Sequence, residues 1–260
     1  MATHGQVIDR REKILEIVNA RGRASVQELA AALDTSEITI RRDLAELSSA
    51  GLVQRSHGGA VSNRSGEMPE PTERFFNEKD VLFIEEKKRI AVMAAQLIQD
   101  GQTVFMNSGT TTLCFLRALQ GRRIRVITNN AAAIGLDPGP GVELVILGGE
   151  YREQSRSLVG EFTLQAISNV YADHTILGTN GISLEKGLTT SVYQECSINQ
   201  AMIEHTHGKV IVIADSSKMG KVANFISSGL SKVDIVITDD GCPKEYRDGL
   251  HALGLEVIIA

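Results

Sequence analysis

Short apolar strands alternate with helical segments from residue 103 onward, and this alternation limits the fold more than any other feature of the sequence. Near-continuous apolar runs rich in β-branched residues are typical of strands that are covered on both faces. Their alternation with helices predicts an α/β domain with a mostly parallel sheet. The expected strands are Thr103–Met106, Arg125–Thr128, Leu144–Leu147, His174–Leu177, Val210–Ala214, Ile235–Thr238 and Leu255–Ile259.

The first 62 residues have a different pattern. Apolar residues at helical spacing among charges predict a first helix over residues 9–20. The run Ser25-Val26-Gln27-Glu28 predicts a capping box for a short helix that ends near Leu33. Ser36 is the expected N-cap of a longer helix that stops before Gly51. A short helix, a tight turn and a longer helix form a helix-turn-helix pattern.

The longer helix has one face for packing and another that suits DNA. At about 100° per residue, Ile40, Leu44 and Leu47 form one apolar stripe. The opposite face and its flanks carry Ile38, Thr39, Arg41 and Arg42. Arginine bridges guanine O6 and N7 or clamps a phosphate, and an outward isoleucine suits a thymine methyl group. A solvated helix face with one stray isoleucine is the alternative.

A short hairpin is predicted after this helix. Residues 52–55 and 60–61 flank His57-Gly58-Gly59, where glycine allows the positive φ of a tight turn. Such a wing places Arg55 and His57 beside the DNA backbone. No second ligand or nucleophile lies near His57 in sequence, which disfavours a metal-ligand or general-base role for it. The candidate DNA-binding residues are Ser36, Ile38, Thr39, Arg41, Arg42, Arg55 and His57.

This part of the chain resembles the DNA-binding segment of the DeoR family of bacterial transcriptional regulators. The similarity lies in the segments SVQELAAAL, TIRRDLAEL and GLVQRSHGGAV. It implies a winged helix-turn-helix of about sixty residues that binds operator DNA. We expect Asp43, next to Arg41 and Arg42, to be structural and to orient these arginines, because repulsion keeps a carboxylate away from phosphate.

Composition limits the classes of protein that remain. A hydrophobic fraction of 42% and a charged fraction of 23% exclude a disordered chain. The net charge of -5 argues against nonspecific coating of nucleic acid, although residues 1–64 hold 9 Lys and Arg against 8 Asp and Glu. No apolar run approaches the roughly 20 residues of a membrane span, and no signal-peptide pattern is present. Three distant cysteines indicate neither disulfides nor a zinc site. We therefore expect a cytoplasmic protein without metal or cofactor.

The polar run SNRSGEMPEP predicts an exposed linker between two domains. We expect a DNA-binding domain over residues 1–62, a linker over 63–80, and an α/β sensor and oligomerisation domain over 81–260. A helix around Lys87 to Leu97 is the candidate connecting element, and the like charges of Lys87 to Arg89 are expected on a solvated face. A monomer that reads one half-site has little affinity, so a homo-oligomer is expected.

Polar, glycine-rich segments follow five of the predicted strands, where ligands of such sheets bind. Asn107 to Thr112 opens a helix and offers amides and hydroxyls that can cradle a phosphate. The segment lacks the Walker lysine, which disfavours a nucleotide triphosphatase. The other segments are Asn129-Asn130, Gly148 to Arg152, Gly178 to Gly181 and Asp215 to Lys218. Each alone is as compatible with an ordinary turn, but five at one sheet edge indicate a pocket for a phosphorylated polyol.

Glu195 belongs to the same expected pocket. It falls on the apolar face of a predicted helix from Tyr193 to Glu204. An inward carboxylate should have a partner, such as ligand hydroxyls or Lys218. The alternative is a first-turn glutamate that only complements the helix dipole. The residues alone favour neither.

This larger part of the chain also resembles the sensor domain of the DeoR family, whose fold is related to ribose-5-phosphate isomerase and which binds sugar phosphates. The resemblance implies that Gly109 to Thr111 hold the phosphate and that Lys218 and Glu195 meet the sugar. The family usually has Asp in place of Asn107, so the polar pattern of the ligand or the charge of the pocket differs here. The candidate effector-binding residues are Asn107, Ser108, Gly109, Thr110, Thr111, Asn129, Arg152, Gly178, Glu195 and Lys218.

The sequence therefore predicts a DNA-binding regulator, a repressor of a sugar-catabolic operon, that responds to a phosphorylated sugar. The competing class is a sugar-phosphate isomerase with an accessory DNA-binding domain, in which Glu195 and Lys218 supply the base and the enediolate stabiliser. Asn107 and the lack of an Asp-Gly-x-x-Asp-Glu run argue against it. A DNA-binding protein whose larger domain has no effector is the third possibility.

Overall fold

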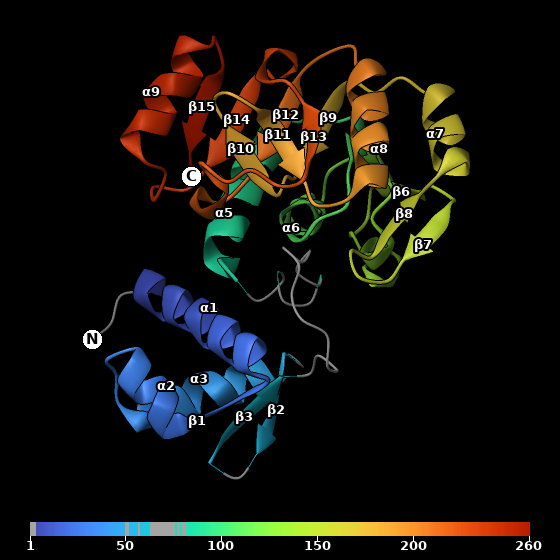
Figure 1. Ribbon diagram of the computed structural model, residues 1–260. Helices are drawn as coiled ribbons and strands as arrows, with labels where there is room; N and C mark the ends of the chain where they lie inside the picture. The colour runs from blue at the N-terminus through green and yellow to red at the C-terminus, as the bar shows by residue number, and fades with distance from the viewer. Residues whose placement is uncertain (1–3, 50–51, 57, 63–75, 77–78, 80–81) are drawn as a thin grey trace. The chain divides into compact units, whose positions relative to one another are not determined.

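The structure is a computed structural model that describes residues 4–49, 52–56, 58–62, 76, 79 and 82–260 (Figure 1). The chain divides into two compact units, Met1–Phe83 and Ile84–Ala260. Of the predicted linker 63–80, only Phe76 and Lys79 lie within the described residues. None of the helices in the described part of the chain has the length and apolarity that a bilayer span requires.

Within its described residues, the N-terminal unit has helices and a three-stranded antiparallel sheet. Its elements are α1 (His4–Arg21), β1 (Arg23–Ser25), α2 (Val26–Ala32), α3 (Glu37–Ser49), β2 (Val53–Ser56) and β3 (Gly59–Ser62). The sheet order is β1-β3-β2, so the expected hairpin is present and a third strand is added to it. The pattern did not predict β1 because three residues are too few to show alternation.

Local hydrogen bonds explain where the helices of this unit begin and end. Ser25 Oγ accepts from the Glu28 amide at 3.2 Å, and Glu28 Oε2 accepts from the Ser25 amide at 2.7 Å, as the capping box predicts. The bond from the Ser25 amide is the main reason that the pKa of Glu28 is lowered. Ser36 Oγ accepts from the Thr39 amide at 3.3 Å at the start of α3. Gly22, with φ of 72°, directly follows α1, which begins earlier than predicted.

The core of the N-terminal unit forms around the predicted stripe of α3. Ile40, Leu44 and Leu47 are at most 2% exposed and pack with the fully buried Ile14 and Val18 of α1. These contacts confirm the helical phase read from the sequence and turn the opposite face of α3 outward.

A seven-stranded parallel sheet is the centre of the larger unit. Its order is β15-β14-β12-β9-β4-β5-β6, and every neighbouring pair is parallel. All seven predicted strands are present, which confirms the expected α/β class. Their bounds are β4 (Thr103–Met106), β5 (Ile124–Thr128), β6 (Val142–Ile146), β9 (His174–Leu177), β12 (Val210–Ile213), β14 (Ile235–Thr238) and β15 (Glu256–Ile259).

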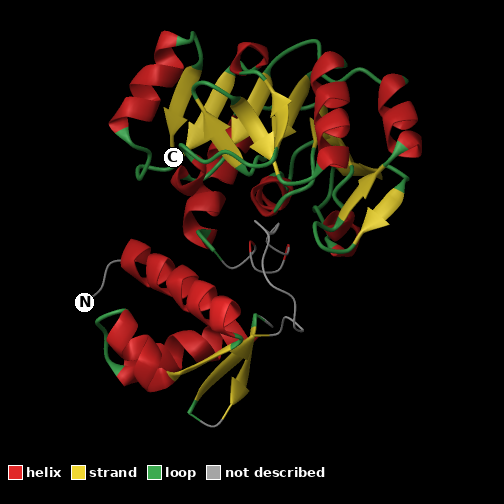
Figure 2. Cartoon of the chain, viewed as in Figure 1, coloured by secondary structure: helices red, strands yellow, loops and turns green. Residues whose placement is uncertain are grey.

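Helices cover both faces of this sheet (Figure 2). One face carries α5 (Ile84–Gln96) and α6 (Thr110–Ala118). The other carries α7 (Glu161–Ser168), α8 (Tyr193–Glu204) and α9 (Lys244–Ala252), whose apolar side chains join two buried clusters with the strands. The predicted bounds of α8 are correct.

Three parts of the larger unit differ from the expectations. A small antiparallel sheet has the order β10-β11-β13, with β10 (Gly181–Ser183), β11 (Gly187–Thr190) and β13 (Phe225–Ser228). A second hairpin pairs β7 (Glu150–Arg152) with β8 (Ser157–Val159). Lys87 is buried at 3% exposure, so the run from Lys87 to Arg89 is not a uniformly solvated face. Only its later members are exposed, in ion pairs with Glu85 and Asp240.

The order of the strands fixes where a ligand is expected. From β4 the chain adds β5 and β6 on one side, and then β9, β12, β14 and β15 on the other. The direction of winding therefore reverses between β4 and β9. Ligands of open α/β sheets bind in the crevice at such a switch point, outside the carboxyl ends of the strands.

Candidate functional site: a DNA-binding face and a polar pocket edge

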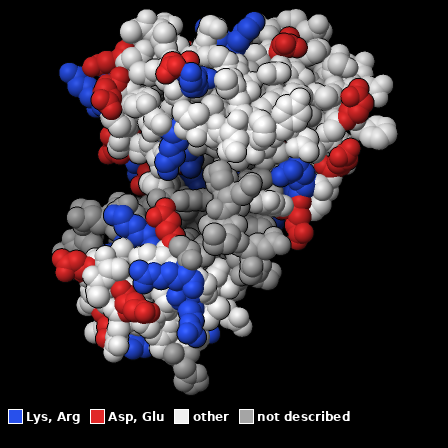
Figure 3. All heavy atoms as spheres, in the orientation of Figure 1, with Lys and Arg blue, Asp and Glu red and all other residues white. Residues whose placement is uncertain are grey.

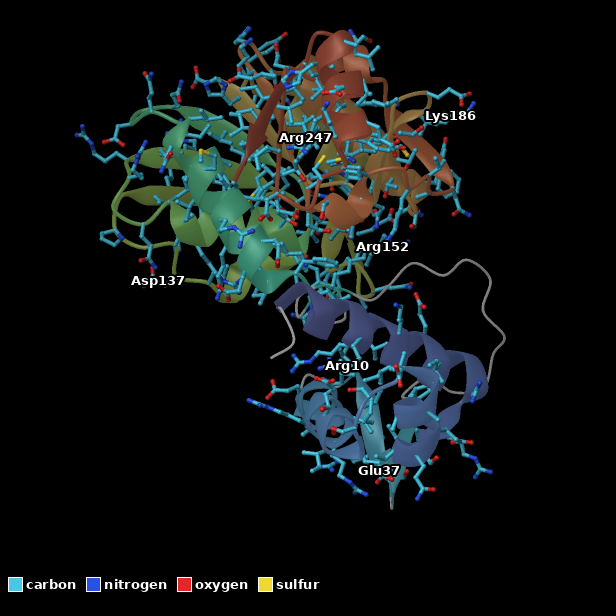
Figure 4. The ribbon with its side chains drawn as sticks, turned by 90° about the vertical axis from the view of Figure 1, so that its left-hand side faces the viewer. Arg10, Glu37, Asp137, Arg152, Lys186 and Arg247 are labelled. Atoms are coloured by element: carbon cyan, nitrogen blue, oxygen red, sulfur yellow. The ribbon has the colours of Figure 1, made fainter. Side chains whose placement is uncertain are left out.

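The outward face of α3 presents the residues expected to contact DNA. Ile38 is 81% exposed, an unusual position for a large apolar side chain. Arg41 lies 3.4 Å from Glu37 in an exposed ion pair, and Figure 4 shows Glu37 on the side of the unit away from α1. Arg42 is exposed and has no recorded ion-pair or hydrogen-bond partner within the described residues. Arg42 is therefore the α3 cation most available to a DNA base or phosphate.

The remaining predicted DNA contacts are less uniform. The hydroxyls of Ser36 and Thr39 lie 2.8 Å apart and are engaged with each other at the start of α3. Arg55 is exposed on β2, in the wing. His57 lies outside the described residues, between β2 and Gly58, whose φ is 83°.

Asp43 is structural, but its partners are not the arginines beside it in the sequence. Its carboxylate accepts from Arg10 Nε at 2.6 Å and from Arg11 Nε at 3.0 Å, and the residue is 2% exposed. On α3, Asp43 lies near the buried stripe, whereas Arg41 and Arg42 are exposed. The expectation that Asp43 orients Arg41 and Arg42 is therefore wrong. Asp43 holds α1 against α3 instead.

The segment that precedes α6 is built to leave backbone amides open. Gly109 is the N-cap residue of α6 and supplies no side-chain cap, so the first amides of the helix have no intrahelical acceptor. The Gly109 carbonyl accepts from Asn130 Nδ2 at 3.0 Å, and the Thr112 hydroxyl bonds back to the Asn107 carbonyl at 2.9 Å. Thr110 and Ser108 lie in the same turn. Open amides on a fixed loop are the usual arrangement for binding phosphate.

Asn107 joins the two strands at the switch point. Its Oδ1 accepts from the Gly178 amide at 2.8 Å, and its Nδ2 donates to the Gly178 carbonyl at 2.9 Å. The same Nδ2 donates to Asn199 Oδ1 at 3.0 Å, and Asn199 Nδ2 donates to Ser227 Oγ at 2.9 Å. Both amide hydrogens of Asn107 therefore have protein acceptors. Asn107 fixes the ends of β4 and β9 relative to α8, which a carboxylate in its place does less well.

Glu195 has hydroxyl partners from two neighbouring elements. Its Oε1 accepts from Ser157 Oγ at 3.3 Å, and its Oε2 accepts from Thr190 Oγ1 at 3.1 Å. Ser157 forms an isolated bridge with Asn130, which holds the Gly109 carbonyl. Glu195 is thus connected through Ser157 and Asn130 to the turn at residues 107–112 that begins α6, called the α6 turn below.

Lys218, which the sequence offered as a possible partner of Glu195, pairs with Asp215 instead. Lys218 lies at the end of a short 3-10 helix (Ser216–Lys218), and its Nζ is 4.0 Å from Asp215 Oδ2. Asp215 is fully buried, and its Oδ2 has no hydrogen-bond partner within the described residues. A lysine above a buried carboxylate at the end of β12 can serve an anionic, hydroxyl-bearing ligand.

Asn129 and Arg152 come from two further elements of the larger unit, the end of β5 and the strand β7. Asn129 follows β5 and donates through Nδ2 to the Leu158 carbonyl at 2.9 Å, and its buried Oδ1 has no hydrogen-bond partner among the described residues. Arg152 ends β7, and Figure 4 shows it at the lower edge of the larger unit, toward which β15 points in Figure 1.

The described residues show little support for nucleophile or metal chemistry. Burial raises the pKa of the Cys196 thiol, and the Glu195 carboxylate adds to the rise, so this thiol stays protonated near neutral pH. All three cysteines are buried, and none of them forms a disulfide within the described residues. No group of three His, Cys, Asp or Glu residues with metal-binding geometry occurs within the part of the chain that the structure describes.

Several residues of this site are not among the candidate effector-binding residues. Asn130, which belongs to one of the five predicted polar segments, donates to the Gly109 carbonyl, and Asn199 accepts from the Asn107 amide. Asn199 is four residues after Glu195 on α8, so helical spacing could have identified it. Thr190 and Ser157 have no such signal, because both lie in the short strands that the sequence pattern did not predict.

A helix-turn-helix unit followed by an α/β unit with polar side chains at the carboxyl edge of its sheet is the architecture of a transcriptional regulator. A family model described as a DeoR-like helix-turn-helix domain matches residues 10–66, and one described as a DeoR C terminal sensor domain matches residues 82–240. The chain belongs to the DeoR family of transcriptional regulators, as the resemblance implied.

Known proteins of similar sequence span almost the whole chain. The glycerol-3-phosphate regulon repressor of Escherichia coli K12 is 35% identical over 95% of this chain and 98% of its own. The HTH-type transcriptional regulator GlpR of Haloferax volcanii is 33% identical over 96% of each chain. The lactose phosphotransferase system repressor of Staphylococcus epidermidis is 33% identical over 89% of this chain and 92% of its own.

Solved structures share less with the chain. Ribose 5-phosphate isomerase A from Methanocaldococcus jannaschii is 15% identical with a TM-score of 0.38, covering 53% of this chain and 55% of that chain. A TM-score of this size does not assign a fold. The α/β class of the larger unit follows instead from its own sheet.

Proposed function

We propose that this protein is a cytoplasmic repressor of a sugar-catabolic operon, that it binds the operator as a homo-oligomer, and that a phosphorylated sugar changes its affinity for DNA. The observation that carries the effector part is the α6 turn, where open amides lie beside the switch point of the sheet. Relatives named as a glycerol-3-phosphate regulon repressor and a lactose phosphotransferase system repressor support the choice of ligand and pathway.

In this proposal the phosphate binds at Gly109 to Thr111, where the amides of α6 favour an anion. Lys218 adds a positive charge, and the unpartnered oxygens of Asn129 and Asp215 accept from hydroxyls of the sugar. The polar atoms at the pocket edge thus include donors for phosphate and acceptors for a polyol. Ligand binding alters DNA affinity only if the ligand favours one of two protein states.

The DNA contacts are proposed for α3 and the wing. Arg42 contacts a base or phosphate in the major groove, Ile38 meets a thymine methyl group, and Arg55 contacts the backbone. The N-terminal part of α3 also approaches the DNA in this proposal, because helix N-termini often contact phosphates. It carries Ser36, Thr39 and Arg41.

Replacing Arg42 by alanine should weaken operator binding by about 1–3 kcal/mol if the guanidinium makes a bidentate base contact. Fluorescence anisotropy with operator DNA at fixed salt measures the change. Arg123→Ala is the matched control, because it removes an arginine that is 83% exposed on the larger unit. Equal affinities of the Arg42 and Arg123 variants would remove Arg42 from the DNA-binding face.

Replacing Lys218 by alanine should leave operator binding intact and abolish the response to the sugar phosphate. A thermal-shift screen against hexose and pentose phosphates and the free sugars identifies the effector first, because a ligand at 100 Kd stabilises by about 2.7 kcal/mol. Lys186→Ala, which removes an exposed lysine paired with Glu185, is the control. A normal response of the Lys218 variant would refute this role of Lys218.

The isomerase alternative predicts a different result in the same screen. Aldose–ketose interconversion of the stabilising sugar phosphate, lost in Glu195→Gln, would assign an enzyme. The partners of Glu195 in the structure are two hydroxyl groups, and Lys218 lies beside Asp215. This arrangement favours a binding site over a paired base and acid.

A further inference from the structure

A cavity of about 320 Å³ lies between α9 and the edge strand β15, and we call it the α9 groove. Its lining comes from one stripe of α9 at helical spacing and from one face of β15. The lining residues are Lys244, Arg247, Asp248, His251, Val257 and Ile259. Figure 4 shows Arg247 where these two elements face the viewer, and Figure 3 shows charged atoms of both signs where α9 lies in Figure 1.

The α9 groove is separate from the proposed sugar-phosphate site. β15 is the outermost strand of the parallel sheet and lies four strand positions from β4, which at about 4.8 Å per position is roughly 19 Å. α9 also covers the face of the sheet opposite to α6, whose first turn is the expected phosphate site. A ligand in the α9 groove therefore does not compete with a sugar phosphate at the α6 turn.

Arg247 brings a partly buried positive charge into the groove without a counter-ion. Its Nε is buried and has no hydrogen-bond partner, and the described residues form no ion pair with its guanidinium. Buried polar groups of native proteins nearly always have partners, and an uncompensated buried cation is costly. An oxyanion bound against the guanidinium compensates this charge, and such pairing is the one that arginine favours.

The other lining residues limit the charge and the shape of this anion. Lys244 and Arg247 are opposed by one carboxylate, that of Asp248, so the lining has a net charge of +1 when His251 is counted as neutral. A single carboxylate balances this charge, whereas a phosphate dianion exceeds it and is repelled by Asp248. The apolar wall of β15 favours a hydrocarbon body beside the carboxylate. We propose that the α9 groove binds an organic monocarboxylate with a short apolar body.

Isothermal titration calorimetry of the full chain with 4-methylpentanoate tests this proposal. A ligand of about eight non-hydrogen atoms in a suitable site should have a dissociation constant of about 1 mM or below. Acetate should bind more weakly, by about three- to fourfold for each methylene group that the groove buries. 4-Methylpentanamide keeps the shape and lacks the charge, so it should bind about tenfold more weakly or less.

Two variants of adjacent residues should change the affinity in opposite directions. Arg247→Gln should weaken binding of 4-methylpentanoate by about tenfold or more, because it removes the charge that pairs with the carboxylate. Asp248→Asn removes the one negative charge of the lining and should tighten binding by about two- to fivefold. Damage to the fold cannot produce this gain. Arg123→Gln is the matched control, since Arg123 is 83% exposed and lies outside the groove, and it should change nothing.

The outcomes decide this proposal independently of the proposed function. Circular dichroism establishes that each variant is folded, and Arg247→Gln should keep the operator affinity and the sugar-phosphate thermal shift of the wild type. Loss of affinity in Arg247→Gln together with a gain in Asp248→Asn supports the site. Equal binding of the carboxylate and its amide, wild-type affinity in either folded variant, or no binding by the wild-type protein would overturn it.

Discussion

Replacing Asp43 by alanine should destabilise the N-terminal unit by about 3 kcal/mol, because removal of one partner from a buried ion pair leaves the other charges uncompensated. The Asp43 side chain is 3% exposed, and the side chains of Arg10 and Arg11 are 14% and 26% exposed. Water cannot fully replace a carboxylate at such positions. Both partly buried arginines then lose the carboxylate that holds them on α3.

Hydrogen exchange of the full chain, read by mass spectrometry, measures this effect within the N-terminal unit. Amides of α1 and α3 should exchange about 100-fold faster in Asp43→Ala, since 3 kcal/mol corresponds to roughly two factors of ten. Glu37→Ala removes an exposed pair with Arg41 and should change exchange little, because surface ion pairs contribute about 0–1 kcal/mol. Equal protection in the Asp43 and Glu37 variants would show that the buried pair does not hold α1.

The Asp43 and Arg42 variants together distinguish a residue that positions α3 from a residue that contacts DNA. Asp43→Ala should weaken operator binding and also raise hydrogen exchange, because the position of α3 depends on α1. Arg42→Ala should weaken operator binding with unchanged exchange, since Arg42 is exposed and has no recorded partner among the described residues. Two neighbouring residues of one helix thus have different roles, and burial decides which role each has.

The sequence predicts the helices and strands whose apolar residues follow a clear local pattern, either a continuous run or helical spacing. The seven strands of the parallel sheet are continuous apolar runs, and α3 buries Ile40, Leu44 and Leu47 because helical spacing places them together. The carboxyl ends of parallel strands meet at one edge for a geometric reason, so the positions of Asn107 and Gly178 at that edge were also predictable.

Pairings between distant residues were not predictable from the pattern. Asp43 bonds to arginines 32 and 33 residues away, although two arginines precede it directly. Asn107 bonds to Asn199, 92 residues further along the chain. Strands of three or four residues, such as β10 and β11, are stabilised by their tertiary partners and have too few residues for a local signal. The hydroxyl partners of Glu195 were missed for the same reason.

Replacing Asn107 by aspartate should destabilise the larger unit by about 3 kcal/mol at pH 8, although related proteins are expected to have aspartate at this position. Oδ1 would still accept from the Gly178 amide. The second oxygen would face the Gly178 carbonyl and Asn199 Oδ1, which now accept from Nδ2 at 2.9 and 3.0 Å. Three acceptors without a hydrogen between them repel, and the site is 4% exposed, so water does not relieve the repulsion.

The pH dependence of this variant gives the sharper test. Burial and the two facing acceptors favour the neutral carboxyl group, so its pKa in the folded state is raised above the unfolded value. A raised pKa gives stability that is fully present below the unfolded pKa and is lost as pH rises through the folded pKa. Protonated, the group donates to the Gly178 carbonyl as Asn107 does. The melting temperature of the variant should therefore approach that of the wild type near pH 4 and fall below it at pH 8.

Asn180→Asp is the matched control for Asn107→Asp. Asn180 follows β9, two residues after Gly178, and its Oδ1 lies 3.1 Å from Thr190 Oγ1. The control adds the same charge without turning a donor into an acceptor, so we expect a small, nearly pH-independent change. If Asn107→Asp behaved like the control, Asn199 would have reversed its amide to donate to the new carboxylate, with the Ser227 hydroxyl donating to Asn199. That result would show that the donors and acceptors in the hydrogen-bond chain from Asn107 to Ser227 can exchange roles. The structure could then hold either asparagine or aspartate at position 107.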